Sequence, residues 1–178
     1  MKLIFRKMLR RITGRAVSVA ELREMGAVIG ENCHIYGMID HGHAFLVTIG
    51  NNVTLASGSR ILAHDGSTKN IVGYSRVGRV DIGDDVFIGA DAIVLASVKI
   101  GSKVIIGAGA VVTKDVPDNS VAVGNPAKVI GTYDDYVEKV KKQIEGAPVW
   151  NTPYRFKTQA EKQEMRDVLL KSGYGFDD

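Results

Sequence analysis

Histidine and aspartate occur together at two places in the chain. One is the segment Asp40–His43, which holds two of the four histidines, and the other is the pair His64–Asp65. A neutral imidazole accepts a proton near neutral pH, and an adjacent carboxylate can orient the ring for that task. The same side chains also bind metal ions. The two segments therefore predict either general-base catalysis or a metal centre.

Aliphatic residues return at every sixth position along most of the chain. Eleven units begin with Ile, Leu or Val, at Ile29, Ile35, Ile49, Leu55, Ile61, Ile82, Ile88, Val94, Ile100, Ile106 and Val112. The fifth position is small or β-branched in ten of the eleven units, including Cys33 and Ile39, and Asp65 is the exception. An α-helix cannot keep every sixth residue on one face, so the repeat predicts short strands joined by corners.

Such units predict a parallel β-helix. Three strands close one triangular coil, and successive coils stack about 4.8 Å apart with the aliphatic residues inside. Eleven units make about four coils. Glycine fills the second position of six units, where we expect a sharp corner that penalises a side chain or needs a positive φ. Cys33 is expected to pack inside, which leaves it no catalytic role.

Two breaks interrupt the repeat. The step from Ile35 to Ile49 is two residues longer than two units, and the step from Ile61 to Ile82 is three residues longer than three units. Extra residues must leave the stack, so we expect loops at residues 40–47 and 65–80. Because loops on a rigid scaffold carry binding and catalytic residues, the breaks predict the functional site.

The segment Leu62–Ser67, ahead of the second loop, resembles the sugar and antibiotic O-acetyltransferases of the hexapeptide-repeat acyltransferase superfamily. Galactoside, maltose and polysaccharide O-acetyltransferases form this branch, and the resemblance covers residues 28–132. It implies an all-β main domain folded as a left-handed parallel β-helix. It also implies that His64 is the catalytic base, which deprotonates a hydroxyl or amine that attacks acetyl-CoA.

The same resemblance implies where a sugar or sugar-nucleotide acceptor binds. Asp40 and His41 are expected to line its pocket, together with Asp65 and with Tyr74 from the second loop. Either Asp40 or Asp65 is expected to orient the imidazole of His64. The basic residues of the second loop favour an acidic or nucleotide-linked sugar.

Two strings near the end of the repeat, Gly107–Asp115 and Val123–Ile130, closely match the end of the helix in this superfamily. They imply acetyl-CoA as co-substrate, with pantetheine lying along small residues of the coils and basic residues near the nucleotide and phosphates. The residues implied are Ala90, Ala108, Thr113, Lys114 and Lys128. The superfamily further implies a homotrimer with active sites between subunits.

Three alternatives remain. The segment Ile39–His43 also resembles serine acetyltransferases, in which case His41 is the base. The γ-type carbonic anhydrases share the repeat and bind zinc through three histidines, here His41, His43 and His64, although the His-x-His spacing departs from that family. A non-catalytic trimerisation scaffold is the third. Under the leading hypothesis no metal is expected, and His43 is a structural loop residue.

Helices are expected at both ends of the β-helix. Residues 1–25 carry seven Lys or Arg against two Glu, and the apolar spacing within Phe5–Ile12 predicts a helix in a basic arm at residues 1–27. Residues 1–15 suit contact with an anionic membrane, or the arm covers the end of the stack. Asp134 or Asp135 begins one helix, and Thr158 with Glu161 begins another in an extension at 133–178.

Composition bounds the remaining possibilities. The chain has 178 residues, 45% of them hydrophobic, and its apolar runs are far shorter than the roughly 20 residues that cross a bilayer. The net charge of +3 comes from the basic arm. We expect no nucleic-acid partner. We expect a cytoplasmic protein, in agreement with its single cysteine.

Overall fold

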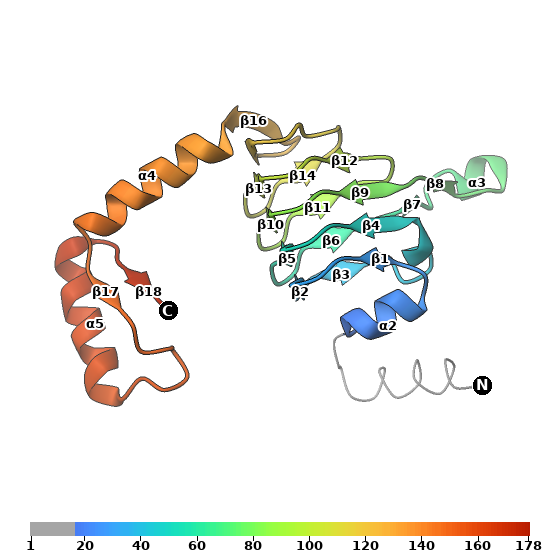
Figure 1. Ribbon diagram of the computed structural model, residues 1–178. Helices are drawn as coiled ribbons and strands as arrows, with labels where there is room; N and C mark the ends of the chain where they lie inside the picture. Colours follow the sequence, from blue (N-terminus) through green and yellow to red (C-terminus); the bar gives the residue numbers. More distant parts are fainter. Residues whose placement is uncertain (1–16) are drawn as a thin grey trace. The chain divides into compact units, whose positions relative to one another are not determined.

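The computed structural model describes residues 17–178 (Figure 1). The chain divides into two compact units, Met1–Tyr133 and Asp134–Asp178. Residues 1–15, for which membrane contact is an expectation, lie outside the described residues. Within residues 17–178, no helix combines the length and the apolar character that crossing a bilayer requires.

The first unit is a parallel β-helix whose strands form three faces (Figure 1). The first face contains β1 (Val28–Ile29), β4 (Val47–Ile49), β9 (Val80–Ile82) and β12 (Lys99–Ile100). The second face contains β2 (His34–Ile35), β5 (Thr54–Leu55), β10 (Val86–Ile88), β13 (Val104–Ile106), β15 (Ser120–Val123) and the antiparallel β16 (Lys128–Gly131). The third face contains β3 (Met38–Ile39), β6 (Arg60–Ile61), β11 (Ile93–Val94) and β14 (Val111–Val112). Four coils each give one strand to every face, as predicted.

The aliphatic repeat forms the core. Ten of the eleven first-position residues are buried, and Ile35 in the first coil is half-buried. The strand register pairs Ile39 with Ile61, and Ile61 with Val94. Ile39 therefore occupies a first position, and the prediction that it fills a fifth position is wrong. The corner from Ile35 to Ile39 is two residues shorter than the corner from Leu55 to Ile61, which shifts the frame.

The second-position glycines are required by close contact between coils. None of the six has a positive φ, which instead occurs at fourth positions such as Asn32 (55°) and Asn52 (56°). A Cβ added to Gly89 would lie 2.5 Å from the backbone nitrogen of Ala108 in the next coil. The expectation that these corners exclude a side chain is therefore confirmed, and the expectation of a positive φ is wrong.

Replacing Gly89 by alanine is expected to lower the free energy of unfolding by about 1–3 kcal/mol. The new Cβ meets backbone atoms of the next coil, which cannot move aside as a flexible side chain does. Gly66→Ala is the matched control, because a Cβ at Gly66 would have no atom of the described residues within 4 Å. Urea unfolding at one fixed protein concentration measures both variants, and equal midpoints for the two would contradict this explanation.

A short helix, α2 (Val19–Glu24), covers the end of the first coil. It begins with a capping box between Ser18 and Glu21, and its Leu22 is buried in the same cluster as the β-helix core. The guanidinium of Arg23 donates to the backbone carbonyls of Ile29 and Gly30. The helix thus closes the apolar end and pairs carbonyls that would otherwise lie at an open sheet edge.

The second unit contains two helices and a pair of short parallel strands. These are α4 (Tyr133–Glu145), β17 (Val149–Trp150), α5 (Gln159–Ser172) and β18 (Phe176–Asp177). The capping box of Thr158 and Glu161 is present, and Gly173 ends α5 in the left-handed conformation, as predicted. The predicted cap of the first helix is wrong, because α4 already begins at Tyr133 and includes Asp134 and Asp135 in its first turn.

Candidate functional site

Both breaks in the repeat leave the β-helix at the same edge, where the chain passes from the third face of one coil to the first face of the next. We call this the loop edge. The step from Ile39 to Ile49 is four residues longer than the six-residue step from Val94 to Ile100. The step from Ile61 to Ile82 is fifteen residues longer. Because the two insertions leave consecutive coils, their first residues lie one above the other.

Each insertion has its own structure. The first makes a tight turn after β3 and continues into the 3₁₀-helix η1 (Ala44–Leu46). The second is a hairpin in which β7 (His64–Asp65) pairs antiparallel with β8 (Arg76–Val77), with the one-turn helix α3 (Lys69–Val72) between them (Figure 1). The predicted loops at 40–47 and 65–80 correspond to these two segments, and the hairpin starts one residue earlier, at His64.

Asp40 lies at the centre of this edge with its side chain buried. Its Oδ1 accepts a hydrogen bond from the backbone N–H of Gly42 at 3.1 Å, and its Oδ2 accepts one from Ala63 at 3.3 Å and one from Nδ1 of His64. Burial by itself would raise the pKa of Asp40. Hydrogen bonds from His64 and Gly42, and the charges of His64 and His43, nevertheless lower that pKa below its ordinary value. Asp40 is therefore a carboxylate at neutral pH.

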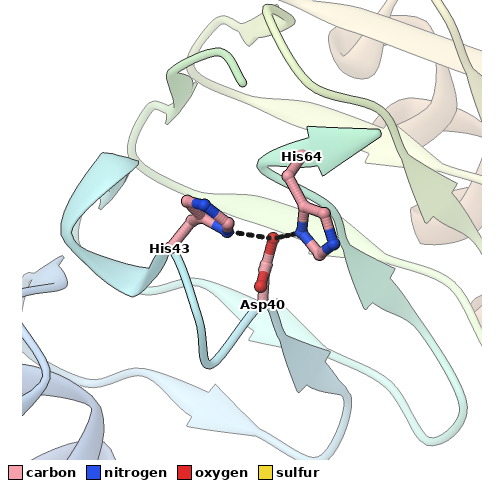
Figure 2. Close-up of side chains that lie close together, drawn as sticks. All are labelled: Asp40, His43 and His64. Atoms are coloured by element: carbon pink, nitrogen blue, oxygen red, sulfur yellow. Dashed lines mark hydrogen bonds and ion pairs between the residues drawn. The ribbon is translucent and has the colours of Figure 1, made fainter. Parts of the chain in front are cut away.

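The imidazole of His64 is held by this carboxylate (Figure 2). A carboxylate can only accept, so Nδ1 of His64 carries the proton and Nε2 presents a lone pair. Nε2 points away from Asp40, and the side chain of His64 is 41% exposed. The arrangement provides an oriented proton acceptor that a substrate can reach. Of the two carboxylates expected to orient His64, Asp40 makes the contact.

His43 lies beside this pair, although its sequence context predicts only a structural loop residue. Its Nδ1 is 3.5 Å from Oδ2 of Asp40, and its ring centroid is 4.7 Å from that of His64 (Figure 2). The atom Nδ1 is buried and has no hydrogen-bond partner among residues 17–178. In the sequence, only the three-residue spacing of Asp40 and His43 could have indicated that they lie close together. That spacing is informative only once the tight turn between them is known.

The other residues predicted to line the acceptor pocket lie outside this cluster. His41 is exposed and is not one of the three residues that converge, which are Asp40, His43 and His64. Asp65 is exposed, and its carboxylate accepts from the backbone N–H of Ser67 at 2.8 Å, a bond that lowers its pKa. Tyr74, in the hairpin, is 79% exposed. Asp40 itself is buried and contacts His64, and its contact with the acceptor stays a prediction.

The residues predicted to bind CoA fall on two edges of the β-helix. Thr113 and Lys114 follow β14 and lie on the loop edge, two coils beyond His64. Ala90 and Ala108 are stacked where the chain passes from the second face to the third, which we call the compact edge. Lys128, at the start of β16, pairs with Val123 at the same end of the second face. The third face separates the two edges, so one chain does not gather these residues into one site.

The cluster of Asp40, His43 and His64 differs from the zinc site predicted from sequence, which used His41, His43 and His64. His41 is not one of the converging residues, whereas Asp40, His43 and His64 each offer one ligand atom within 4.8 Å of the others. That spacing is within reach of a divalent cation. However, Asp40 and His64 share a hydrogen bond, and ligands of one tetrahedral zinc ion stand about 3.3 Å apart, farther than hydrogen-bonded atoms. An ion would have to displace the bond that orients His64.

Two solved structures that resemble this chain are named as acetyltransferases. A hexapeptide-repeat containing acetyltransferase from Vibrio cholerae superposes with a TM-score of 0.57 over 71% of this chain and 88% of its own, at 20% identity, and shows the fold. A maltose O-acetyltransferase from Clostridium difficile superposes with a TM-score of 0.50 over 71% of this chain and 83% of its own, at 31% identity. The molecule is thus a left-handed β-helix of the acetyltransferase class.

Sequence comparison gives the family within that class. The family model for bacterial transferase hexapeptide (six repeats) matches residues 79–114. Protein CapG of Staphylococcus aureus is 40% identical over 148 residues, which are 79% of this chain and 83% of that protein. The chain belongs to the hexapeptide-repeat acyltransferase superfamily, and the resemblance seen in its motifs is confirmed.

Proposed function

We propose that this protein transfers the acetyl group of acetyl-CoA to a hydroxyl or amine of a sugar or sugar-nucleotide acceptor, with His64 as the general base. The hydrogen bond between Asp40 and His64 is the observation that carries the proposal, because it leaves Nε2 as an oriented proton acceptor on a partly exposed side chain. The likeness to a maltose O-acetyltransferase supports a sugar acceptor. The fold is also shared with an acetyltransferase from Vibrio cholerae that was solved as a complex with acetyl coenzyme A.

The chemistry follows from this geometry. Nε2 of His64 takes the proton of the acceptor hydroxyl while the acceptor oxygen forms a bond to the carbonyl carbon of the thioester. The carbon–sulfur bond then breaks, and the imidazolium returns its proton to the departing thiolate, which leaves an acetyl ester and free CoA. The carboxylate of Asp40 stabilises the imidazolium between these steps.

The acceptor and donor sites are best explained by a homotrimer with each site between two subunits. Within one chain, His64 and the compact edge stand on opposite sides of the third face. Large exposed side chains near the compact edge, Tyr36, Met38 and Phe87, provide an apolar surface for a neighbouring copy. Such an arrangement would bring the loop edge of one chain, with Thr113 and Lys114, against the compact edge of the next.

Mixing two inactive variants tests the shared site. Trimers of His64→Ala lack the base, and trimers of Ala108→Trp have a blocked compact edge. Subunits unfolded together and refolded as mixed trimers are expected to regain activity, because some sites then combine an intact His64 with an intact compact edge from its neighbour. Refolding each variant alone is the control. If mixed trimers form, as shown by differently tagged subunits, and stay inactive, each site belongs to one chain.

A thiol-release assay tests the proposed reaction itself. We expect the protein to release free CoA from acetyl-CoA when a sugar or sugar nucleotide is present, above the rate without acceptor. Mass spectrometry of the product distinguishes an ester from an amide. Release with serine but with none of the sugars or sugar nucleotides would contradict the sugar assignment and favour the serine acetyltransferase alternative.

A further inference from the structure

The environment of His43 is unusual for a structural loop residue. Its side chain is 29% exposed, yet its Nδ1 is shielded from water and makes no hydrogen bond within the part of the chain that the structure describes. Polar atoms that are shielded in this way are nearly always paired in folded proteins. The polar atom that this nitrogen faces is Oδ2 of Asp40, at 3.5 Å. This gap is slightly too long for a good hydrogen bond.

The charge of Asp40 fixes the proton on His43. If Nδ1 of a neutral His43 carried a lone pair, two lone pairs would face each other across the gap, which is unfavourable beside a buried carboxylate. With the proton on Nδ1, the imidazole is a donor aimed at Oδ2. Hydrogen bonds of catalytic groups are often long in unliganded structures and shorten when the reacting complex forms.

We infer that His43 is a positioning residue of this site, which donates from Nδ1 to Oδ2 of Asp40 and holds that carboxylate in place while His64 carries the proton of the acceptor. This inference rests on the proposed function. The backbone N–H groups of Gly42 and Ala63 each donate to one oxygen of Asp40, at 3.1 and 3.3 Å. His43 adds a donor that faces Oδ2, and its ring also packs against that of His64.

Two substitutions separate hydrogen bonding from packing. His43→Phe keeps an aromatic ring near His64 and near Phe45, whose ring centroid is 6.1 Å from that of His43, but removes the donor. His43→Asn loses the ring but places an amide N–H close to the former position of Nδ1. We expect His43→Phe to lower kcat about 10- to 100-fold with an unchanged KM for acetyl-CoA, the loss typical of removing a group that orients a reacting residue. His43→Asn should remain within about threefold of the wild type, far less than that loss.

Wild-type kcat in His43→Phe, or an equal loss in both variants, would show that the donor does not matter. Nitrogen NMR of histidine side chains gives a readout independent of turnover, and an unprotonated Nδ1 at His43 would also overturn the inference. If His64→Ala keeps its activity, the proposed base is wrong. If only His64→Ala is inactive, the base stands and the role of His43 fails.

Discussion

His64→Ala is expected to lower kcat for acetyl transfer about 10²- to 10⁴-fold, which is the usual contribution of a positioned general base. The imidazole is oriented by Asp40, and its Nε2 is the group that takes the proton of the acceptor in the proposed reaction. The substitution leaves the compact edge untouched, so the affinity for acetyl-CoA should change little. Steady-state thiol release and calorimetric titration with CoA measure the two quantities.

His41→Ala is the matched control for this prediction. His41 belongs to the same edge and also lies beside Asp40 in sequence, but it is exposed and is not among the three converging side chains. Its replacement should leave kcat within a few-fold of the wild type. Turnover that survives in His64→Ala and disappears in His41→Ala would reverse the assignment and make His41 the base.

Asp40→Asn is expected to lower kcat about 10²-fold or more, because it disturbs the tautomer of His64. The two oxygens of Asp40 both accept from backbone N–H groups, those of Gly42 and Ala63. An amide has only one oxygen, so in either orientation its NH₂ group faces an N–H. When the NH₂ group faces His64, the ring must accept at Nδ1 and carry its proton on Nε2, where it is no longer a base.

The same substitution should lower the free energy of unfolding by about 1–3 kcal/mol at neutral pH, through the unpaired N–H. The pKa of Asp40 is below its ordinary value of 3.8, so the stabilisation by this carboxylate is complete above that pH. It is lost as the pH falls through the lower pKa of the folded state. The difference between wild type and variant should therefore shrink only in strong acid.

Asp65→Asn is the control for both effects. Asp65 neighbours His64 in sequence, but its carboxylate is exposed and accepts from Ser67 in its own turn. Urea unfolding and steady-state kinetics on both variants should show a loss for Asp40→Asn alone. Equal kinetic losses would mean that charge near His64 matters more than the hydrogen bond.

Much of the fold could be predicted because few folds are compatible with an aliphatic residue at every sixth position. Each aliphatic residue, such as Ile88 or Ile106, faces the core only if a corner follows every strand, and the strands then stack in register. Local signals were equally direct at Thr158, whose side chain caps α5 within four residues of sequence. The left-handed sense of the β-helix was inferred from the resemblance to the superfamily, because left-handed and right-handed β-helices can have the same residue spacing.

In the first coil, the spacing of aliphatic residues does not show which residue begins each six-residue unit. Ile35 and Ile39 are both aliphatic, and only the pairing of Ile39 with Ile61 shows that the corner between them is short. The two breaks consequently look unrelated in sequence, whereas in the structure they open at one edge. His43 was missed for this reason, since a residue in a loop acquires a role only from what the neighbouring coil places beside it.

The aliphatic core was thus determined by sequence, through a period that needs no knowledge of distant contacts. A local motif also made His64 the candidate base, through its resemblance to a family. The tertiary structure decided which carboxylate holds His64, that a second imidazole stands beside it, and that the predicted CoA residues lie on two edges. The physical reason is that hydrogen bonds act over about 3 Å. Residues such as Asp40 and His64 come that close only after coils have stacked.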